Sequence, residues 1–272
     1  MMSEMLKNQV AIVTGSARGI GREVAQMFVD HGAKVVITDK DEAPAAEAVT
    51  AIREAGGEAI SFCGDVTAPD FAKNIIHTTI KNFGRLDILV NNAGYTADNL
   101  VHRLTDEQFQ EMLDIHLIAP FRLIREATPY MRDVAKKEIE NGVTNYRKIV
   151  NVSSMSGVKG NVGQANYAAA KAGLLGLTKT IALEWGQFNI NCNSVAFGFI
   201  DTRLTRPKEE GGSVNGAQVG IPTKVRDAII NKIPQRRAGE VKEAASSIFY
   251  LSSPLSNYIN GQVHLVNGGS YS

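Results

Sequence analysis

A glycine-rich segment, Thr14-Gly15-Ser16-Ala17-Arg18-Gly19-Ile20-Gly21 (TGSARGIG), determines how the rest of the chain is interpreted. It follows the apolar run Val10–Val13 directly and leads into Gly21–His31, whose apolar residues recur at helical spacing. The three glycines permit a tight turn and a close backbone approach, and the first turn of a helix offers free N–H groups to an anion. A strand, a glycine-rich turn and a helix in this order predict a dinucleotide-binding loop rather than an ordinary structural turn.

Outward from this segment, short runs rich in Val, Ile and Leu alternate with amphipathic stretches. Such runs are typical of parallel strands buried on both faces of a sheet, and helices between parallel strands form right-handed crossovers. We therefore expect an α/β fold, a doubly wound seven-stranded parallel sheet with helices on both faces, of the Rossmann type. The predicted strands are Val10–Val13, Lys34–Thr38, Ala59–Phe62, Leu86–Val90, Lys148–Val152, Ile190–Val195 and Val263–Val266.

Length and composition indicate one folded domain. The chain has 272 residues, of which 44% are hydrophobic and 21% charged, and no repeat or linker divides it, so we expect a single domain over residues 1–272. Lys and Arg number 29 and Asp and Glu number 28. This balance lacks the strongly basic face that nucleic acids and anionic membranes attract, and neither is an expected partner.

Targeting and cysteine features point to the cytoplasm. The N-terminal residues lack the apolar core of a secretory signal, and no apolar run reaches the ~18 residues of a membrane span. Cys63 and Cys192 form no CxxC pair, and the five histidines lack metal-ligand spacing. We therefore expect a cytoplasmic protein with free thiols and no metal site.

Two segments extend beyond this framework. Residues 132–147 carry several charges followed by Asn141-Gly142, a pattern that is typical of a helix extension and an exposed turn. Residues 204–220 (LTRPKEEGGSVNGAQVG) are rich in glycine and charge and lack periodicity. A loop of this length in a compact domain is either disordered or a functional lid, and we expect a substrate lid here.

The end of the second predicted strand bears on the choice of dinucleotide. Asp39 follows that strand, 18 residues after Gly21, where a carboxylate can bind the ribose hydroxyls of NAD and would repel the 2′-phosphate of NADP. Arg18 favours the opposite choice, because a guanidinium in the glycine loop can pair with that phosphate. A solvated carboxylate at a strand end is a further interpretation of Asp39. We predict NAD and keep NADP as the alternative.

A second set of candidate residues follows the fifth predicted strand. Ser154 lies just after that strand, and Tyr167 and Lys171, four residues apart, share one face of an alanine-rich helix. A phenol is a poor acid–base catalyst at neutral pH, but a nearby ammonium and a cationic nicotinamide ring would stabilise the phenolate; lowering its pKa by ~3 units requires ~4 kcal/mol. Ser154 could donate a hydrogen bond to the substrate oxygen. Tyrosine and lysine at this spacing are common, and only their place beside a dinucleotide loop makes them catalytic candidates.

Together these residues resemble the short-chain dehydrogenase/reductase family over nearly the whole chain. The matching motifs, in order, are TGSARGIG (14–21), Asp65-Val66, NNAG (91–94), Ser154, YAAAK (167–171) and VNGG (266–269). Within the family, the segments GQANYAAAKAGLLGLTK (163–179) and NAGYTADNLVHRLT (92–105) are most similar to 3-oxoacyl-[acyl-carrier-protein] reductases.

The resemblance implies a role for each matching position. Ser154, Tyr167 and Lys171 would catalyse hydride transfer between a nicotinamide cofactor and a ketone or secondary alcohol. The substrate that the resemblance favours is a 3-oxoacyl thioester. A homotetramer is also implied, through helices around Thr105–Met131 and Gln164–Gly186. Besides Tyr167 and Lys171, the implied cofactor-binding residues are Gly15, Ser16, Arg18, Ile20 and Gly21 on the pyrophosphate and adenosine side, Asp65 and Val66 at the adenine, Asn92, Ala93 and Gly94 at the ribose, and Ile200 and Thr202 at the nicotinamide carboxamide.

Two positions depart from the family pattern. His116 stands where the family usually has an asparagine, and Phe197-Gly198 replaces a usual Pro-Gly. The family's asparagine holds a water next to the catalytic lysine and so connects the tyrosine to solvent. His116 is therefore a catalytic candidate: it could take over this relay, which would add a titration near pH ~6.5, or it could simply pack.

The motif set defines a reaction class rather than one substrate. Polyol, hydroxysteroid and aromatic diol dehydrogenases share it, so the expected partner is a small molecule or an acyl thioester. A non-catalytic NAD-binding regulatory protein is a further alternative, which His116 and Phe197 favour. The intact Ser154, Tyr167 and Lys171 argue against it, because a protein without catalysis has no physical need of all three.

Overall fold

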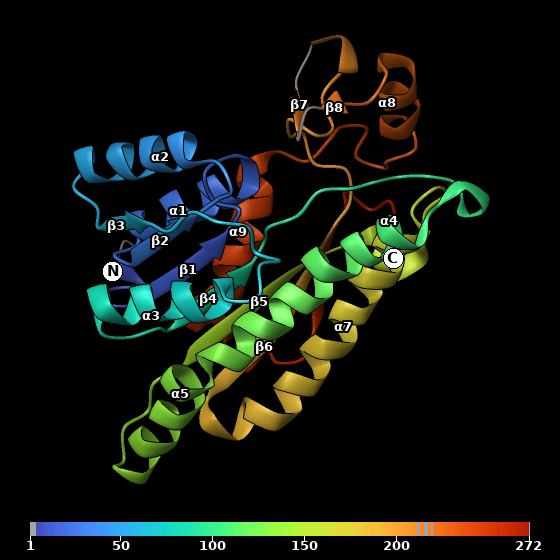
Figure 1. The fold of residues 1–272 in the computed structure, drawn as a ribbon. Helices are drawn as coiled ribbons and strands as arrows, with labels where there is room; N and C mark the ends of the chain where they lie inside the picture. Colours follow the sequence, from blue (N-terminus) through green and yellow to red (C-terminus); the bar gives the residue numbers. More distant parts are fainter. Residues whose placement is uncertain (1–3, 211–212, 215–216, 219, 272) are drawn as a thin grey trace.

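The computed structural model describes residues 4–210, 213–214, 217–218 and 220–271 (Figure 1). Its central sheet contains the strands β1 (Val10–Thr14), β2 (Lys34–Thr38), β3 (Ala59–Ser61), β4 (Ile88–Asn91), β5 (Arg147–Ser154), β6 (Ile190–Phe197) and β9 (Val263–Val266). The strand order is β3-β2-β1-β4-β5-β6-β9, and every neighbouring pair is parallel. The chain winds outward from β1 in both directions, which confirms the predicted doubly wound, Rossmann-type sheet.

The observed strands differ from the predicted ones mainly at their ends. β5 and β6 each continue past the last residue of the predicted apolar run, and the ladder between them ends with Ser154 opposite Phe197. Buried polar residues such as Ser153 and Asn193 form part of this ladder. The length of β5 and β6 is therefore set by backbone hydrogen bonding between them, which cannot be predicted from the apolar pattern.

The helices are α1 (Gly19–Asp30), α2 (Glu42–Glu54), α3 (Phe71–Phe83), α4 (Asp106–Leu113), α5 (Ala119–Glu140), α6 (Met155–Lys159), α7 (Ala165–Trp185), α8 (Thr223–Ile230) and α9 (Val241–Ser252). Helices cover both faces of the sheet, whereas α8 lies away from it (Figure 1). One apolar cluster lies between the sheet and α1, α2 and α9 and includes Phe28 and Ile52. Another lies under α3, α5 and α7 and includes Leu123 and Trp185. Cover on both faces explains why the central strands are almost continuously apolar.

The two segments predicted to extend beyond the framework have different outcomes. α5 reaches Glu140 and is followed by a turn with Gly142 at a φ of 73°, as predicted. Arg147, however, begins β5 and is buried rather than exposed.

In the predicted lid, residues 211–212, 215–216 and 219 lie outside the described residues. The described part holds a short antiparallel pair, β7 (Ser213–Val214) and β8 (Ala217–Gln218), where a loop without regular structure was expected. In Figure 1 this pair projects at the top of the molecule together with α8.

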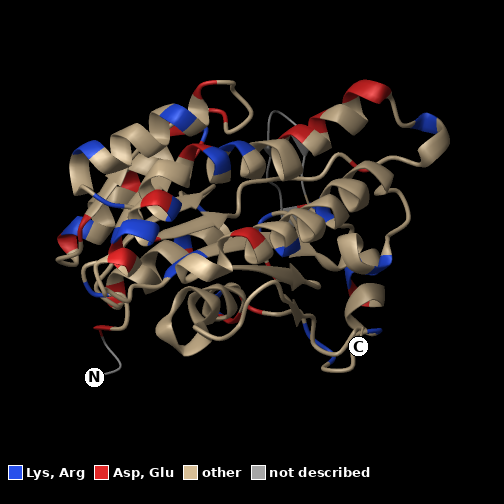
Figure 2. Ribbon diagram, turned by 90° about the horizontal axis from the view of Figure 1, so that it is seen from below, with Lys and Arg blue, Asp and Glu red and all other residues tan. Residues whose placement is uncertain are grey.

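Charged residues are distributed over many elements. Figure 2 shows acidic and basic residues interspersed along the helices and loops. Within the described residues, no helix combines the length and the apolarity that crossing a membrane requires.

Candidate active site

The carboxyl ends of the parallel strands bring the predicted site residues to one edge of the sheet. β1 leads into the glycine-rich turn, β2 ends just before Asp39, β4 leads into Asn92, and β5 ends at Ser154. In open α/β sheets this edge is where ligands bind, because the loops after neighbouring strands meet there.

The glycine-rich turn is pressed against the segment that follows β4. Gly15 has a φ of 64°, and a Cβ there would lie 2.9 Å from the Cα of Ala93. A Cβ at Gly21 would lie 2.3 Å from the carbonyl oxygen of Gly15 and 2.6 Å from Nδ2 of Asn92. The Asn92 amide donates to the carbonyl oxygens of Thr14 and Gly15 at 2.9 and 3.1 Å. Glycine is therefore required at both positions, and Asn92 joins the two segments.

The start of α1 fits an anionic group of a dinucleotide. Arg18 is the N-cap residue, no side chain caps the first turn, and that turn contains no acidic residue. A Cβ at Gly19, whose φ is 56°, would meet no atom within 4 Å. Free N–H groups at the positive end of a helix dipole, facing open space, suit a pyrophosphate.

Ser16 supports this turn from inside the protein. Its fully buried hydroxyl donates to the carbonyl oxygen of Val13 at 2.6 Å and accepts from the Thr38 N–H at 3.0 Å. Its own N–H donates to the carbonyl oxygen of Thr38 at 2.8 Å. Ser16 thus ties β1 to β2, and the cofactor contact that the resemblance implies for it stays a prediction.

Charged side chains after β2 pair with one another on the predicted adenosine side. Arg18 lies 2.7 Å from the Asp41 carboxylate, and Lys40 lies 3.3 Å from the Asp65 carboxylate. The Asp39 carboxylate accepts a hydrogen bond of 3.3 Å from the Asp41 N–H. The two ion pairs are largely exposed and contribute about 0–1 kcal/mol each, so a ligand can rearrange them at small cost.

Two predicted cofactor-binding residues contribute apolar contacts at this end. Ile20 packs against the apolar cluster beneath α1. Val66 packs against the cluster on the opposite face of the sheet. Both are only partly buried, which leaves part of each side chain available to a ligand.

Ser154, Tyr167 and Lys171 come together where β5 ends and α7 begins. Lys171 Nζ lies 5.6 Å from the centroid of the Tyr167 ring and donates to the carbonyl oxygen of Val152 at 2.6 Å. The Ser154 side chain lies close enough to the Tyr167 hydroxyl to oppose the rise of the Tyr167 pKa, and Ser154 Oγ accepts from the Ser156 N–H at 3.1 Å. The helix spacing and the strand end thus bring all three predicted catalytic residues into one site.

Burial favours the neutral forms of both titratable groups in this trio. It raises the pKa of Tyr167 to about 12, which the Ser154 hydrogen bond opposes and the charge of Asp98 reinforces. It lowers the pKa of Lys171 to about 7. Among the protein's own groups, the cost of burying a phenolate exceeds the hydrogen-bonding gain, and the expected lowering of the Tyr167 pKa by Lys171 together with a nicotinamide ring stays a prediction. A neutral phenol is a group that can donate a proton.

His116 packs directly against this trio. It belongs to a π-helical stretch, Asp114–Ile118, between α4 and α5. Its ring meets the Tyr167 ring edge-on, with centroids 4.9 Å apart at 89°, and its Nε2 lies 2.7 Å from the carbonyl oxygen of Tyr95. Burial, and then the charge of Lys171, lowers the pKa of His116 well below 6.5. The prediction that His116 titrates near pH 6.5 as part of a relay is therefore wrong for this environment.

The segment after β6 is fixed by backbone pairing. Phe197 pairs with both β5 and β9, so this chain extends the strand where the family usually has a proline. Ile200 is buried and forms a bridge with Gly239. The Thr202 N–H donates to the Thr205 hydroxyl at 2.9 Å, which closes the turn that precedes the predicted lid.

Asp98 and Gln164 were not among the predicted site residues. Gln164 is buried, donates to the Asp98 carboxylate at 2.9 Å and accepts from the Ser156 hydroxyl at 2.7 Å. Because Ser156 also bonds Ser154, this chain of contacts supports the candidate catalytic serine. Both residues lie within the quoted stretches 92–105 and 163–179, where a polar side chain next to the predicted catalytic residues was the available signal.

Comparison with known proteins agrees with this geometry. A family model described as enoyl-(acyl carrier protein) reductase matches residues 15–271. A 3-oxoacyl-[acyl-carrier-protein] reductase of Vibrio cholerae is 37% identical over 267 residues, 98% of each chain. Enzymes of the same name from Thermotoga maritima and Escherichia coli are 35% and 36% identical over 97% of this chain and 98% of their own.

The chain belongs to the short-chain dehydrogenase/reductase family. It is an oxidoreductase of that family, related to the 3-oxoacyl-[acyl-carrier-protein] reductases. Membership implies a nicotinamide cofactor, which the open glycine turn and the uncapped start of α1 fit.

Proposed function

We propose that this protein reduces the keto group of 3-oxoacyl thioesters with a nicotinamide cofactor. The observation that carries the proposal is the convergence of Ser154, Tyr167 and Lys171 where β5 ends and α7 begins, with Lys171 Nζ 5.6 Å from the centroid of the Tyr167 ring. This group stands at the same sheet edge as a turn that fits a dinucleotide. The relatives named 3-oxoacyl-[acyl-carrier-protein] reductases support the substrate class.

The cofactor, when bound, supplies the hydride. The first-turn N–H groups of α1 would hold its pyrophosphate, and the segment containing Asn92, Ala93 and Gly94 would border its ribose. Ser154 and Tyr167 would donate hydrogen bonds to the substrate carbonyl oxygen and stabilise the negative charge that develops on it. Tyr167 would then give its proton to that oxygen, since an alkoxide is a much stronger base than a phenolate. The ammonium form of Lys171 would stabilise the resulting phenolate.

Within this proposal the preferred cofactor is NAD(H). The carboxylates of Asp39 and Asp41 lie on the predicted adenosine side, and Arg18 is already paired with Asp41 at 2.7 Å. A 2′-phosphate would have to compete for that guanidinium and approach two carboxylates. Residues 204–220, which follow Thr202, would serve as a substrate lid. Resemblance to the family supports a cytoplasmic homotetramer.

A substrate panel tests the proposal. Purified protein would be assayed with 3-oxoacyl thioesters, hydroxysteroids and small polyols, each with NAD(H) and NADP(H), by following nicotinamide absorbance. The expected result is the largest kcat/KM for a 3-oxoacyl thioester. A larger value for a steroid or polyol would make the protein a dehydrogenase of another secondary alcohol. Cofactor binding without turnover on any substrate would favour the regulatory alternative.

A further inference from the structure

The tautomer of His116 is set by its neighbour Tyr95. The Nε2 atom lies 2.7 Å from the Tyr95 carbonyl oxygen, and because a carbonyl oxygen only accepts, the ring proton belongs on Nε2. Tyr95 is itself held in place, since its hydroxyl is hydrogen-bonded to the Glu111 carboxylate of α4. The Nδ1 atom of His116 is consequently left with a lone pair and acts as an acceptor.

The ring of His116 is wedged between two parts of the site. On one side it meets the Tyr167 ring edge-on. On the other, a Cβ at Gly94 would lie 2.1 Å from Cε1 of His116, so only glycine leaves room for the ring. The imidazole therefore fills the space between the segment after β4 and α7, and its orientation limits where the Tyr167 ring can lie.

The Nδ1 atom is buried and has no hydrogen-bond partner within the described part of the chain. A buried acceptor without a donor costs free energy, and the whole side chain is only 2% exposed. Lys171 is the charged neighbour whose field reaches the ring, and it opposes protonation. Nδ1 is thus an acceptor inside the candidate active site that the protein's own contacts do not satisfy.

We propose that His116 is a positioning residue that works as a permanently neutral imidazole. Its Nε2–H anchors the ring to the Tyr95 carbonyl, its edge orients the Tyr167 phenol, and its Nδ1 accepts one hydrogen bond from a donor within the site. No proton passes through the ring. The effect on turnover rests on the proposed function, because it acts through Tyr167.

Two amide variants separate the two nitrogen atoms of the ring. His116→Asn places an amide near the position of Nδ1, whereas His116→Gln places one near Nε2 and leaves no acceptor at Nδ1. His116→Phe keeps only the ring edge. We expect kcat to fall by ~10- to 10²-fold for the Gln and Phe variants, the range for a misplaced reacting group. The Asn variant should retain about tenfold more kcat than Gln, with KM for the cofactor unchanged in all three. Wild-type kcat in the Gln and Phe variants would show that the ring only packs.

Nitrogen NMR of the wild-type protein tests the tautomer without substrate. With imidazole-15N-labelled histidine, and with the His116 signal assigned by its loss in His116→Asn, the ring should stay neutral, with its proton on Nε2, as the pH falls through about 6.5, where an ordinary imidazole becomes protonated. Protonation at about pH 6.5, or a proton on Nδ1, would overturn the proposal. Because this spectrum needs no turnover, its failure is distinguishable from failure of the proposed function.

Discussion

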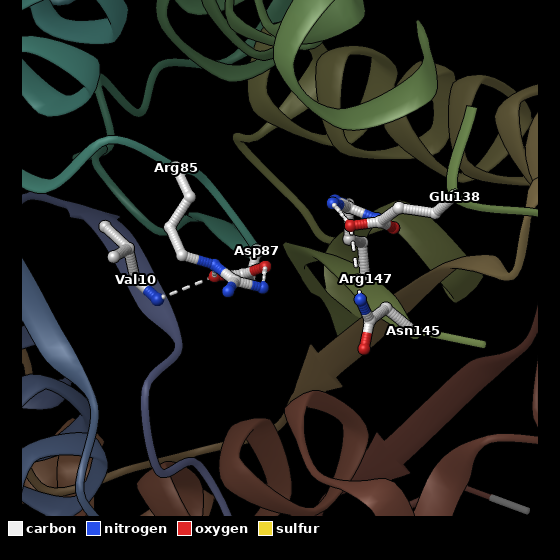
Figure 3. A network of polar contacts seen from close by, with 6 residues as sticks. All are labelled: Val10, Arg85, Asp87, Glu138, Asn145 and Arg147. Atoms are coloured by element: carbon white, nitrogen blue, oxygen red, sulfur yellow. Dashed lines mark hydrogen bonds and ion pairs between the residues drawn. The ribbon is translucent and has the colours of Figure 1, made fainter. Parts of the chain in front are cut away.

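The two ends of the sheet differ in the partners that they give to buried titratable side chains. At the amino end, Arg85 bonds Asp87 twice at 2.8 Å, and Arg147 bonds Glu138 at 2.6 and 3.0 Å (Figure 3). The Asp87 carboxylate also accepts from the Val10 N–H at 2.9 Å. Here opposite charges face each other, and the Arg147 guanidinium lowers the pKa of Glu138. These contacts connect the starts of β1 and β4 and join the start of β5 to α5.

At the carboxyl end, burial is not compensated by opposite charge. Lys171 bonds a backbone carbonyl, and its pKa falls to about 7. Burial raises the pKa of Tyr167 to about 12. Groups held in this way exist in neutral forms that can gain or lose a proton during a reaction. The difference teaches that a buried titratable group without an oppositely charged partner has its pKa shifted toward the neutral form, which a reactive group needs but which does not by itself make a group reactive.

Lys148 shows that a lowered pKa alone does not make a lysine a candidate catalytic residue. It lies at the amino end, 5.5 Å from the centroid of the Tyr146 ring, and burial lowers its pKa to about 7. Its Nζ donates to Asn191 and Asn257 at 2.8 Å each. The distance between Nζ and the ring centroid is nearly the same as for Lys171 and Tyr167, but the glycine-rich turn lies at the opposite, carboxyl edge of the sheet. Position at the carboxyl edge is what separates the two.

The largest expected effect comes from removing the candidate acid. Tyr167→Phe should lower kcat by ~10²- to 10⁴-fold, the usual loss for a general acid–base group, with cofactor affinity little changed. Tyr146→Phe, its counterpart at the other end, should keep wild-type kcat. Steady-state kinetics and cofactor titration check both variants. Near wild-type turnover in Tyr167→Phe would eliminate the phenol as the acid.

The amino end should respond in stability rather than in kcat. Glu138→Gln leaves the Arg147 guanidinium, whose side chain is 2% exposed, without its charge partner, and should cost about 3 kcal/mol of unfolding free energy. The measurement is denaturant unfolding, with the exposed Glu140→Gln on the same helix as control. The folded-state pKa of Glu138 is lowered, so the contribution is present above its usual range and is lost as pH falls through the folded value. Equal stability of the two variants would contradict the assigned role.

Cofactor choice should change by an intermediate amount. Asp39→Ala removes a carboxylate from the predicted ribose site and should narrow the preference for NADH over NADPH by about 1–3 kcal/mol. The ratio of kcat/KM values for the two cofactors measures it. Glu47→Ala, an exposed carboxylate on α2, is the matched control. If the wild-type protein has the larger kcat/KM with NADPH, Arg18 determines the choice and the prediction of NAD is wrong.

The smallest expected effect is a pH dependence that Lys171 imposes. Its ammonium form is lost as pH rises through about 7, so reduction should slow by about tenfold per pH unit above that value. Lys171→Arg keeps its charge at all these pH values and should flatten this limb, whatever its absolute rate. Lys148→Arg should leave the limb unchanged. A wild-type rate that stays flat to pH ~9 would show that the Lys171 charge is not needed.

The sheet was predictable because its strands are nearly continuous apolar runs, and the candidate site because its residues follow strand ends at fixed spacings. What the sequence did not report depends on contacts between distant residues. Arg147 was expected to be exposed, because nothing local shows that Glu138 reaches it. Burial raises the pKa of Tyr167, which was not expected, because the sequence shows Lys171 four residues away but not how deeply both are buried. Likewise, the link from His116 to Tyr95 joins residues 21 positions apart.

The contact between the glycine turn and the segment after β4 has a consequence for redesign of this protein. Any side chain at Gly15 or Gly21 would collide with backbone atoms, so these two positions of the predicted pyrophosphate site tolerate no side chain. The ion pairs of Arg18 with Asp41 and of Lys40 with Asp65 are exposed, so side chains of other sizes can replace them without a collision. Engineering effort aimed at a different nicotinamide cofactor therefore belongs at these four side chains, where replacements cost little stability.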